Sequence, residues 1–480
     1  MAPGVVVVGA GISGLVTAYR LAQSREDLDI QVLEASPRAG GTMGTESVHG
    51  FAFERGPNGF LDNVPQTVEL STELGLGDRL LRASEGARNR FLWKNGRLLP
   101  LPQKPMELLT SPLLSLRGKL RLLLEPFQGR EQRGVEESVA AFARRRLGQE
   151  AATTFLDPLV TGVYGGDAER ISLDAAFPSV AALEREHGSL FRGFRVRAKE
   201  RRLAEKSESS ENAPTAASAA PPASSRTHGT LCSFEQGLEE LVRALSERLG
   251  PRLRLGSPVE EVRLRRGEGY EVVLRDRNAL RSRAVVLALP APRAATLVSS
   301  WNSDLAMSLE EIPYAPIAVI CLGYARADVG HPLDGFGFLI PRDQGCRTLG
   351  AIFVSTLFPC HAPEGMVSLR AMVGGARDPE AVGLSEDDLI GLVLREIGPV
   401  LDVRGEPAVR RVYRYTQGIP QYNVGHSKRL RRIDGWLRQL PGLFLTGNAY
   451  RGVGLNDCVA DGGRVSIEAL DFLGSRQGAA

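Results

Sequence analysis

The stretch that decides the fold is Val5-Val6-Val7-Val8-Gly9-Ala10-Gly11-Ile12-Ser13-Gly14, near the start of a 480-residue chain. Four consecutive valines predict a buried strand, and the glycine-rich turn leads directly into an apolar segment that predicts a helix. The first glycine allows a tight turn, the second lets the backbone approach a pyrophosphate, and the third lets the helix pack close to the strand. We therefore expect a dinucleotide whose pyrophosphate lies at the N-terminus of this helix.

A second apolar strand and an acid complete this fingerprint. Ile30-Gln31-Val32-Leu33 predicts the strand, and Glu34, followed by Ala35, stands at its end, about 20 residues beyond the glycines as the fingerprint requires. A carboxylate there accepts hydrogen bonds from ribose hydroxyls, and its charge repels a 2′-phosphate. The pattern therefore favours FAD or NAD over NADP.

Length and composition describe a multidomain globular protein. A chain of 480 residues is too long for one core, so two or three domains are expected. No apolar run is long enough to span a bilayer, and the early valines lack the basic flank of an export signal. The five cysteines have no metal-like spacing, which fits reduced thiols, so we predict no metal site and a cytoplasmic protein.

One segment has the composition of a linker. Residues 207–227 are almost entirely Ser, Ala, Pro, Glu and Asn, which cannot bury enough surface to offset the entropy of ordering, and we expect disorder there. A basic run from Arg192 to Arg202 precedes it. With only Phe191 and Phe194 interleaved, nucleic-acid binding is not indicated. A solvated helix face or contact with an anionic membrane surface both fit.

A leucine-rich helix is predicted between Pro112 and Pro126. Its apolar face comprises Leu113, Leu116, Leu120, Leu123 and Leu124, and Arg117 and Arg121 lie on another face. Such a helix either covers a core or lies in a membrane interface.

The C-terminal part repeats the logic of the N-terminus. After several strand-like runs between residues 259 and 413, Leu443-Phe444-Leu445-Thr446-Gly447 predicts a strand, followed by a glycine-rich loop through Gly454 and a helix from about Gly462 to Leu473. We therefore expect the two ends of the chain to meet around one cofactor.

Further motifs resemble a known family. Glu34 followed by Arg38 and Gly40-Gly41, together with Phe53-Glu54-Arg55-Gly56-Pro57-Asn58-Gly59, resembles the FAD signature of the flavin amine oxidase superfamily. Five later stretches, in family order, resemble protoporphyrinogen oxidases: Asn89-Arg90-Phe91, residues 162–167, residues 336–339, residues 418–422 and residues 450–458.

This resemblance implies an oxygen-dependent oxidation of protoporphyrinogen IX to protoporphyrin IX in haem biosynthesis. Six electrons would be removed in three FAD cycles, with release of H₂O₂. The six histidines lie far apart, and no residue is assigned as a catalytic base, because the flavin supplies the chemistry.

The resemblance also implies a substrate site. Arg90 is expected to pair with a propionate of the substrate, since guanidinium and carboxylate form a bidentate, charge-assisted pair. Gly162 would present its backbone to the macrocycle, and Phe336, Leu339 and Met372 would form apolar walls. Asn58 stands at the flavin edge, where some relatives carry Arg.

The same resemblance implies one non-covalent FAD per chain. Its expected contacts are Gly9, Ala10, Gly11, Ile12, Ser13, Gly14, Glu34, Ala35, Gly40, Gly41, Thr42, Gly56, Pro57, Asn58, Gly59, Val259, Tyr415, Gly447, Asn448, Val453, Gly454 and Leu455.

The expected fold is α/β, with three parts. A discontinuous Rossmann-like FAD-binding domain would comprise residues 1–88, 228–296 and 425–480, a mixed-sheet substrate domain residues 297–424, and a mainly helical, membrane-associated domain residues 89–206. The helical part would attach the protein peripherally to the inner face of the cytoplasmic membrane, and a homodimer is left open.

Two alternatives stay open at this stage. The first is an enzyme of the same fold that acts on coproporphyrinogen III, which carries four carboxylates instead of two. The second is a carrier of the GDP-dissociation-inhibitor type, which shares the architecture without redox chemistry.

Overall fold

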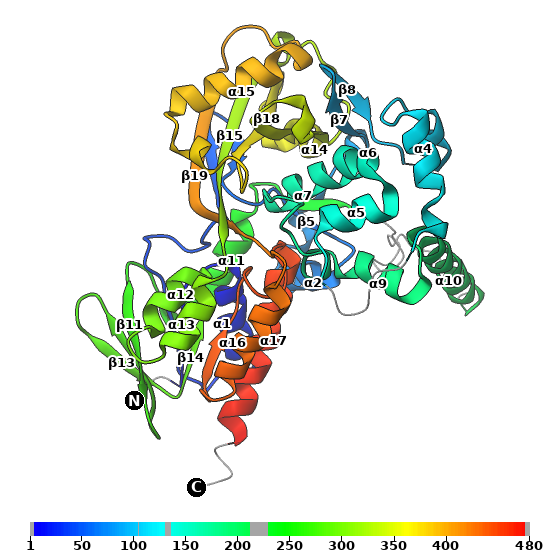
Figure 1. Ribbon diagram of the computed structural model, residues 1–480. Helices are drawn as coiled ribbons and strands as arrows, with labels where there is room; N and C mark the ends of the chain where they lie inside the picture. Colours follow the sequence, from blue (N-terminus) through cyan, green and yellow to red (C-terminus); the bar gives the residue numbers. More distant parts are fainter. Residues whose placement is uncertain (1–3, 104, 130–135, 212–228, 476–480) are drawn as a thin grey trace.

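The computed structural model describes residues 4–103, 105–129, 136–211 and 229–475. Helices α1 and α17 and a parallel sheet form the lower part of the molecule in Figure 1, and the long strands β15, β18 and β19 form the upper part. Helices between α4 and α10 lie on the right.

The lower part is built on five parallel strands in the order β10-β2-β1-β14-β20. Their bounds are Leu253–Arg254, Ile30–Leu33, Val5–Val8, Ala284–Leu287 and Leu443–Leu445. All four valines of β1 are buried, because helices and a second sheet cover the two faces.

The two faces of β1 pack against different elements. Val5 and Val7 face a core formed with the helices α1 (Ile12–Ser24), α11 (Glu239–Leu249) and α17 (Leu455–Ser475). Val6 and Val8 face a core on the other side, formed with the elements α12 (Ala291–Val298), α13 (Ser303–Glu310), α16 (His426–Leu437), β11 (Val259–Arg265) and β12 (Gly269–Leu274). This alternation follows from the two-residue period of a strand.

The upper part is a seven-stranded mixed sheet in the order β19-β15-β18-β17-β16-β7-β8. Neighbouring strands are antiparallel except β16 and β7, which are parallel. The bounds are Val409–Pro420, Tyr314–Ala325, Met366–Gly374, Thr348–Phe353, Gly337–Leu339, Arg90–Lys94 and Arg97–Pro100. Helix α15 (Glu386–Leu401) packs on one face of this sheet.

A buried ion pair holds the helical part together. Its helices are α3 (Pro105–Thr110), α4 (Leu116–Leu123), α5 (Val139–Leu147), α6 (Gln149–Ala151), α7 (Asp157–Tyr164), α8 (Leu173–Ala176), α9 (Pro178–His187) and α10 (Leu190–Glu211). Glu125 pairs with Arg146, both fully buried, and accepts hydrogen bonds from Ser189 Oγ (2.6 Å) and the N–H of Leu190 (2.9 Å). Glu125 thus ties the end of α4 to the start of α10.

Short elements complete the chain. They are β3 (Thr45–Val48), β4 (Phe51–Glu54), β5 (Phe60–Leu61), β6 (Leu80–Arg82), β9 (Leu231–Phe234), β13 (Ala279–Ser282), α2 (Pro65–Glu73) and α14 (Val354–Leu357).

The structure differs from the sequence expectations in three places. Helix α17 begins at Leu455, not near Gly462. Gly462 lies inside the helix and allows it to pack closely on α1, since a Cβ there would lie 2.8 Å from the carbonyl oxygen of Ser13. Leu113 precedes α4 and is buried, so it does not belong to the leucine face. Helix α10 continues through Glu211 into the segment that we expected to be disordered, since its Glu, Lys and Ala residues favour helix. Residues 212–227 of that segment lie outside the described residues.

Within the described ranges, no helix is both long and apolar enough to cross a membrane.

Candidate active site

The turn after β1 uses its glycines as the fingerprint predicts. Gly9 has φ +102°, and a Cβ there would lie 2.4 Å from the carbonyl oxygen of Ala288. A Cβ at Gly14 would lie 2.1 Å from the carbonyl oxygen of Gly9. Gly11 is different, because no atom lies within 4 Å of its hypothetical Cβ. The space in front of Gly11 is therefore not filled by protein atoms, and a ligand phosphate fits there against the backbone.

Glu34 lies at the carboxyl end of β2 and joins three segments. Its Oε2 accepts a hydrogen bond from the N–H of Ala10 (2.8 Å), and its Oε1 accepts from the N–H and Oγ of Ser36 (both 2.9 Å). Its carbonyl oxygen accepts from the N–H of Ser257 (2.8 Å). The segment that leads into Val259, the first residue of β11, is thereby held beside the acid.

The Gly40-Gly41 turn lies against the first turn. The N–H of Gly40 donates to the carbonyl oxygen of Ala10 (2.7 Å), and a Cβ at Gly41 would lie 3.4 Å from the Cα of Gly11. The guanidinium of Arg38 donates to the carbonyl oxygens of Ala39, Gly41 and Met43 at 2.7–2.9 Å. Arg38 therefore shapes this turn from within.

Residues 56–59 extend the same surface. A Cβ at Gly56 would lie 2.2 Å from the carbonyl oxygen of Thr42, and one at Gly59 would lie 2.5 Å from that of Cys232. Next to Pro57, the amide oxygen and nitrogen of Asn58 are both buried, and no described residue forms a hydrogen bond with either atom. Buried amides are nearly always paired, so these atoms fit a polar group supplied by a ligand.

The loop between β20 and α17 meets the same end of the sheet. The carboxyl ends of parallel strands, here β1, β2, β14 and β20, share one edge, where ligands of such sheets bind. Gly447 has φ +130° and donates to Asp461 Oδ2 (3.4 Å), which also accepts from Thr446 Oγ1 (2.7 Å). The N–H of Gly454 donates to Asp457 (3.0 Å) just before α17 begins at Leu455.

The remaining expected cofactor residues lie on these elements. Ile12 and Ser13 are buried in the first turn of α1, Ala35 and Thr42 are exposed, and Val453 packs against the core that contains Tyr422. Tyr415 lies on β19, and burial raises the pKa of its hydroxyl.

A buried arginine connects the cofactor segment to the mixed sheet. Arg370 on β18 is 5% exposed and donates to the carbonyl oxygen of Gly56. Burial lowers its pKa, and the charges of Cys321, Glu54 and Tyr415 oppose that shift. Arg370 thus places a cation directly behind the segment that ends at Asn58.

The expected substrate residues gather on the mixed sheet and the helix beside it. Arg90 begins β7, opposite Gly337 on β16, and its guanidinium lies 5.3 Å from the ring centroid of Phe336. Leu339 and Met372 both pair with Gly350 of β17 from its two sides. Gly162 on α7 faces this group, because a Cβ there would lie 2.8 Å from Cδ2 of Leu339.

Two further arginines near α7 are already paired. Arg342 and Arg377 both donate to the buried carboxylate of Asp157 at 2.7–3.1 Å, and Arg377 also donates to Thr161 Oγ1 (2.9 Å). Arg342 also donates to Asp167 Oδ1 (2.9 Å), so the two carboxylates offset the two arginines. Arg90, in contrast, has no carboxylate partner among the ion pairs of the described residues.

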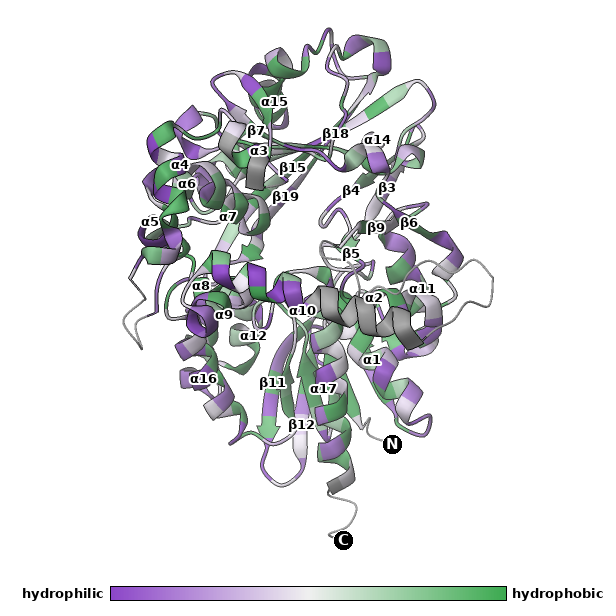
Figure 2. Ribbon diagram, turned by 90° about the vertical axis from the view of Figure 1, so that its right-hand side faces the viewer, coloured by the Kyte–Doolittle hydropathy of each residue, from purple (hydrophilic) through white to green (hydrophobic). Residues whose placement is uncertain are grey.

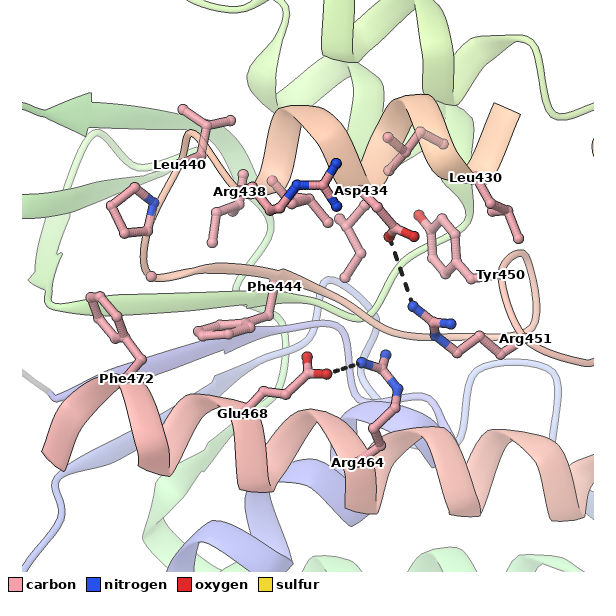
Figure 3. Close-up of a pocket in the computed structure, with 16 residues that line it drawn as sticks. Leu430, Asp434, Arg438, Leu440, Phe444, Tyr450, Arg451, Arg464, Glu468 and Phe472 are labelled. Carbon is pink, nitrogen blue, oxygen red and sulfur yellow. Dashed lines mark hydrogen bonds and ion pairs between the residues drawn. The ribbon is translucent and has the colours of Figure 1, made fainter. Parts of the chain in front are cut away.

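A separate cavity lies away from these residues. It measures about 420 Å³ at the open edge of β20, between α16 and α17, and its lining includes Arg438, Phe444, Tyr450 and Phe472 (Figure 3). Arg451 and Arg464 in its wall are paired with Asp434 (3.7 Å) and Glu468 (2.6 Å). None of the residues predicted for cofactor or substrate lines this cavity.

Four residues that shape the site were not among those predicted to bind cofactor or substrate: Arg38, Arg370, Tyr422 and Asp461. Arg38 and Tyr422 stand inside the motifs of residues 34–41 and 418–422, but the sequence assigned neither a role. Arg370, Tyr422 and Asp461 act across 14 to 314 residues of sequence, so no local pattern indicates their partners.

The fold and the site define a class of protein, a dinucleotide-dependent oxidoreductase with a doubly wound nucleotide-binding sheet. The family model of flavin-containing amine oxidoreductases matches residues 12–470. The chain belongs to this family, and its cofactor is FAD.

Individual relatives agree with this assignment. The chain is 35% identical over 483 residues to the chloroplastic protoporphyrinogen oxidase of Nicotiana tabacum, covering 98% of this chain and 85% of the relative. It is 29% identical over 481 residues to the coproporphyrinogen III oxidase of Bacillus subtilis (strain 168), covering 98% of both. The crystal structure of a proposed protoporphyrinogen oxidase from Exiguobacterium sp. 255-15 superposes with a TM-score of 0.82 at 26% identity, covering 98% of this chain and 99% of that one.

Proposed function

We propose that this protein oxidises a porphyrinogen to the porphyrin with O₂ as acceptor, and that protoporphyrinogen IX is its preferred substrate. The observation that carries the proposal is the group of Arg90, Phe336, Leu339 and Gly162, which combines apolar walls with a guanidinium that forms no ion pair with any described residue. Such a group suits a flat apolar macrocycle with carboxylate arms. The names of the relatives from Nicotiana tabacum and Bacillus subtilis support the same chemistry.

In this proposal the chain's own residues bind, orient and exclude water. When bound, FAD supplies the two-electron oxidising chemistry. The guanidinium of Arg90 anchors a propionate, while Phe336, Leu339 and Met372 cover the macrocycle and keep water away. Gly162 keeps α7 close to Leu339. No side chain of the chain is assigned as a proton acceptor.

We propose the cofactor residues on the same basis. The turn at Gly9–Gly14 and the Gly40-Gly41 turn would hold the pyrophosphate, and Glu34 the ribose. Asn58, Gly447, Asn448 and residues 453–455 would face the flavin, with Tyr415 at its side and the backbone of Val259 at the adenine. The unpartnered amide of Asn58 and the open space at Gly11 support this arrangement.

Coproporphyrinogen III is the second candidate substrate, because a relative of 29% identity bears that name. Four carboxylates need more free cations than two, and Arg342 and Arg377 are neutralised by Asp157 and Asp167. This pairing favours the substrate with two carboxylates. Membership of a flavin-containing family favours an oxidase over a carrier without redox chemistry.

The test is an aerobic assay of both porphyrinogens with the purified holoenzyme, followed by porphyrin fluorescence. We expect a higher kcat/KM with protoporphyrinogen IX. Faster turnover of coproporphyrinogen III would reverse the preference, and a colourless protein that releases no flavin in acid would reinstate the carrier.

We also propose that the helical part binds a membrane surface peripherally. Leu116, Leu120, Leu123, Leu124 and Phe127 are 42–83% exposed on and just after α4. Glu125 joins this segment to α10, which adds the exposed Phe194 and the exposed cations Arg192, Arg195, Arg197 and Lys199, on the coloured first part of α10 in Figure 2. Apolar side chains beside cations suit the interface of an anionic bilayer.

Vesicle sedimentation tests this proposal. Vesicles of phosphatidylcholine with phosphatidylglycerol should carry the wild-type protein into the pellet, and the double variant Leu116→Ser, Leu120→Ser should stay in the supernatant. Ile467→Ser is the matched control, because Ile467 is 61% exposed on α17. Equal sedimentation of all three proteins would refute the proposal. We also retain three proposals from the sequence: association with the inner face of the cytoplasmic membrane, the three-domain division with its boundaries, and a homodimer. Gel filtration measures the oligomeric state.

A further inference from the structure

Tyr422, just beyond the end of β19, holds the loop between β20 and α17 at two points. Its side chain is 2% exposed. Its hydroxyl donates to the carbonyl oxygen of Asn448 (2.7 Å) and accepts from the N–H of Gly452 (2.8 Å). One hydroxyl therefore fixes this loop at both Asn448 and Gly452.

The preceding residue holds a different element. Gln421 is 3% exposed, and its amide Nε2 donates to the carbonyl oxygens of Tyr164 (2.8 Å) and Ile419 (3.0 Å). Tyr164 is the last residue of α7, the helix that carries Gly162. Gln421 thus fixes the end of this helix relative to β19.

The two residues are themselves held by their backbones. The N–H of Gln421 donates to the carbonyl oxygen of Pro313 (2.8 Å), and the carbonyl oxygen of Tyr422 accepts from the N–H of Ser172 (2.8 Å). The ring of Tyr422 stacks on His426 at 4.1 Å between centroids and lies 5.8 Å from that of Tyr164. Side chains on so fixed a backbone are oriented before any ligand binds.

We infer that Gln421 and Tyr422 are a pair of positioning residues that set the cofactor loop and the substrate helix relative to each other. The two residues are adjacent just beyond the end of β19. The side chain of Gln421 binds the end of α7 and that of Tyr422 binds the loop, so a shift of either element moves the other. The inference rests on the proposed function, in which the loop faces the flavin and α7 faces the porphyrinogen. It assigns the pair no contact with either molecule.

The cofactor arm is tested with Tyr422→Phe in the holoenzyme. On heating, flavin release is followed by flavin fluorescence, and unfolding by far-UV circular dichroism. Removing one hydroxyl breaks two hydrogen bonds without changing the packing, so FAD affinity should fall about fivefold or more, and flavin should leave before the fold is lost.

Tyr450→Phe is the matched control. Tyr450 lies in the same loop, but its side chain lines the separate cavity of Figure 3, and its buried hydroxyl has no hydrogen-bond partner among the described residues. We expect both the wild type and this variant to release flavin together with unfolding. Coincident release and unfolding in Tyr422→Phe would overturn the cofactor arm, because a merely structural hydroxyl would shift both signals equally.

The substrate arm is tested with Gln421→Met, which keeps the side-chain volume and removes the amide. We expect KM for the porphyrinogen to rise about fivefold or more with unchanged flavin release, and an unchanged KM would overturn this arm. If the wild type oxidises no porphyrinogen, the proposed function and the substrate arm fail together. The flavin measurement still decides the role of Tyr422.

Discussion

The carboxylate of Glu34 accepts a hydrogen bond from the backbone N–H of Ala10 at 2.8 Å, so the acid after the second strand is bound directly to the glycine turn after the first. Its other oxygen is held by Ser36. A carboxylate oxygen has capacity for more than one donor. Glu34 can therefore bind a ribose hydroxyl while it keeps the two turns in register.

Replacement of Glu34 should weaken FAD binding. In Glu34→Ala, the hydrogen bonds to a charged acceptor are lost, and the dissociation constant of FAD should rise by about 10- to 100-fold. Titration of the apoprotein, followed by quenching of flavin fluorescence, measures this constant. Glu26→Gln, an exposed acid before the same strand, should bind FAD as the wild type does. An unchanged constant in Glu34→Ala would remove Glu34 from the cofactor site.

Two glycines of the same turn should give opposite results when changed to alanine. Gly11→Ala should fold normally, since its Cβ meets no atom within 4 Å, but should contain little flavin because the methyl group occupies the approach to the pyrophosphate. Gly14→Ala should lower the free energy of unfolding, because its Cβ would lie 2.1 Å from the carbonyl oxygen of Gly9. Urea unfolding measures the loss of stability, and the ratio of flavin absorbance to protein absorbance measures the flavin content. Full flavin content in Gly11→Ala would contradict the placement of the pyrophosphate.

The parts of the fold that the sequence predicts are those set by local patterns. The strand of Val5–Val8, its glycine turn and Glu34 follow from burial on both faces and from backbone sterics within 30 residues. The strand at 443–445 was predicted for the same reason. Their assembly around one sheet edge was expected by analogy between the two ends of the chain.

Other features depend on partners distant in sequence. Gly462 looks like a helix start, but it is a contact between α17 and α1. The hydroxyl of Tyr422 finds its partners on another element, and Arg370 reaches Gly56 across 314 positions. Such contacts require the tertiary structure, because no spacing in the sequence encodes them.

Arg90 should control substrate affinity. Its guanidinium lies over Phe336 at 5.3 Å, which orients it for a bidentate pair with a carboxylate. In Arg90→Ala, KM for protoporphyrinogen IX should rise by about 10- to 100-fold, with kcat less affected. Arg90→Lys should recover only part of this loss, because an ammonium does not form the bidentate pair. Arg97→Ala on the neighbouring strand β8 is the control, and equal KM values in all four proteins would exclude the proposed pair.

The carboxyl group of Glu54 is buried beside the cofactor segment. It is 2% exposed and accepts hydrogen bonds from the N–H of Leu238 (2.7 Å) and Thr45 Oγ1 (3.1 Å). Burial raises its pKa from 4.5 to about 8, although these hydrogen bonds and the charge of Arg370 act in the opposite direction. The native state therefore keeps this proton at pH values where the unfolded chain has lost it.

Stability should fall as the pH rises through this window. Between about pH 4.5 and 8 the native state binds more protons at Glu54 than the unfolded state, so this group lowers the free energy of unfolding by up to about 1.4 kcal/mol per pH unit. Glu54→Gln lacks this titration. The free energy of unfolding of the wild type minus that of the variant should therefore fall from pH 5 to pH 8. Urea unfolding at four pH values measures it, and the other titrating groups cancel because both proteins contain them. A difference that is constant over this range would show that Glu54 is already ionised in the native protein, paired with the charge of Arg370 rather than neutralised by burial.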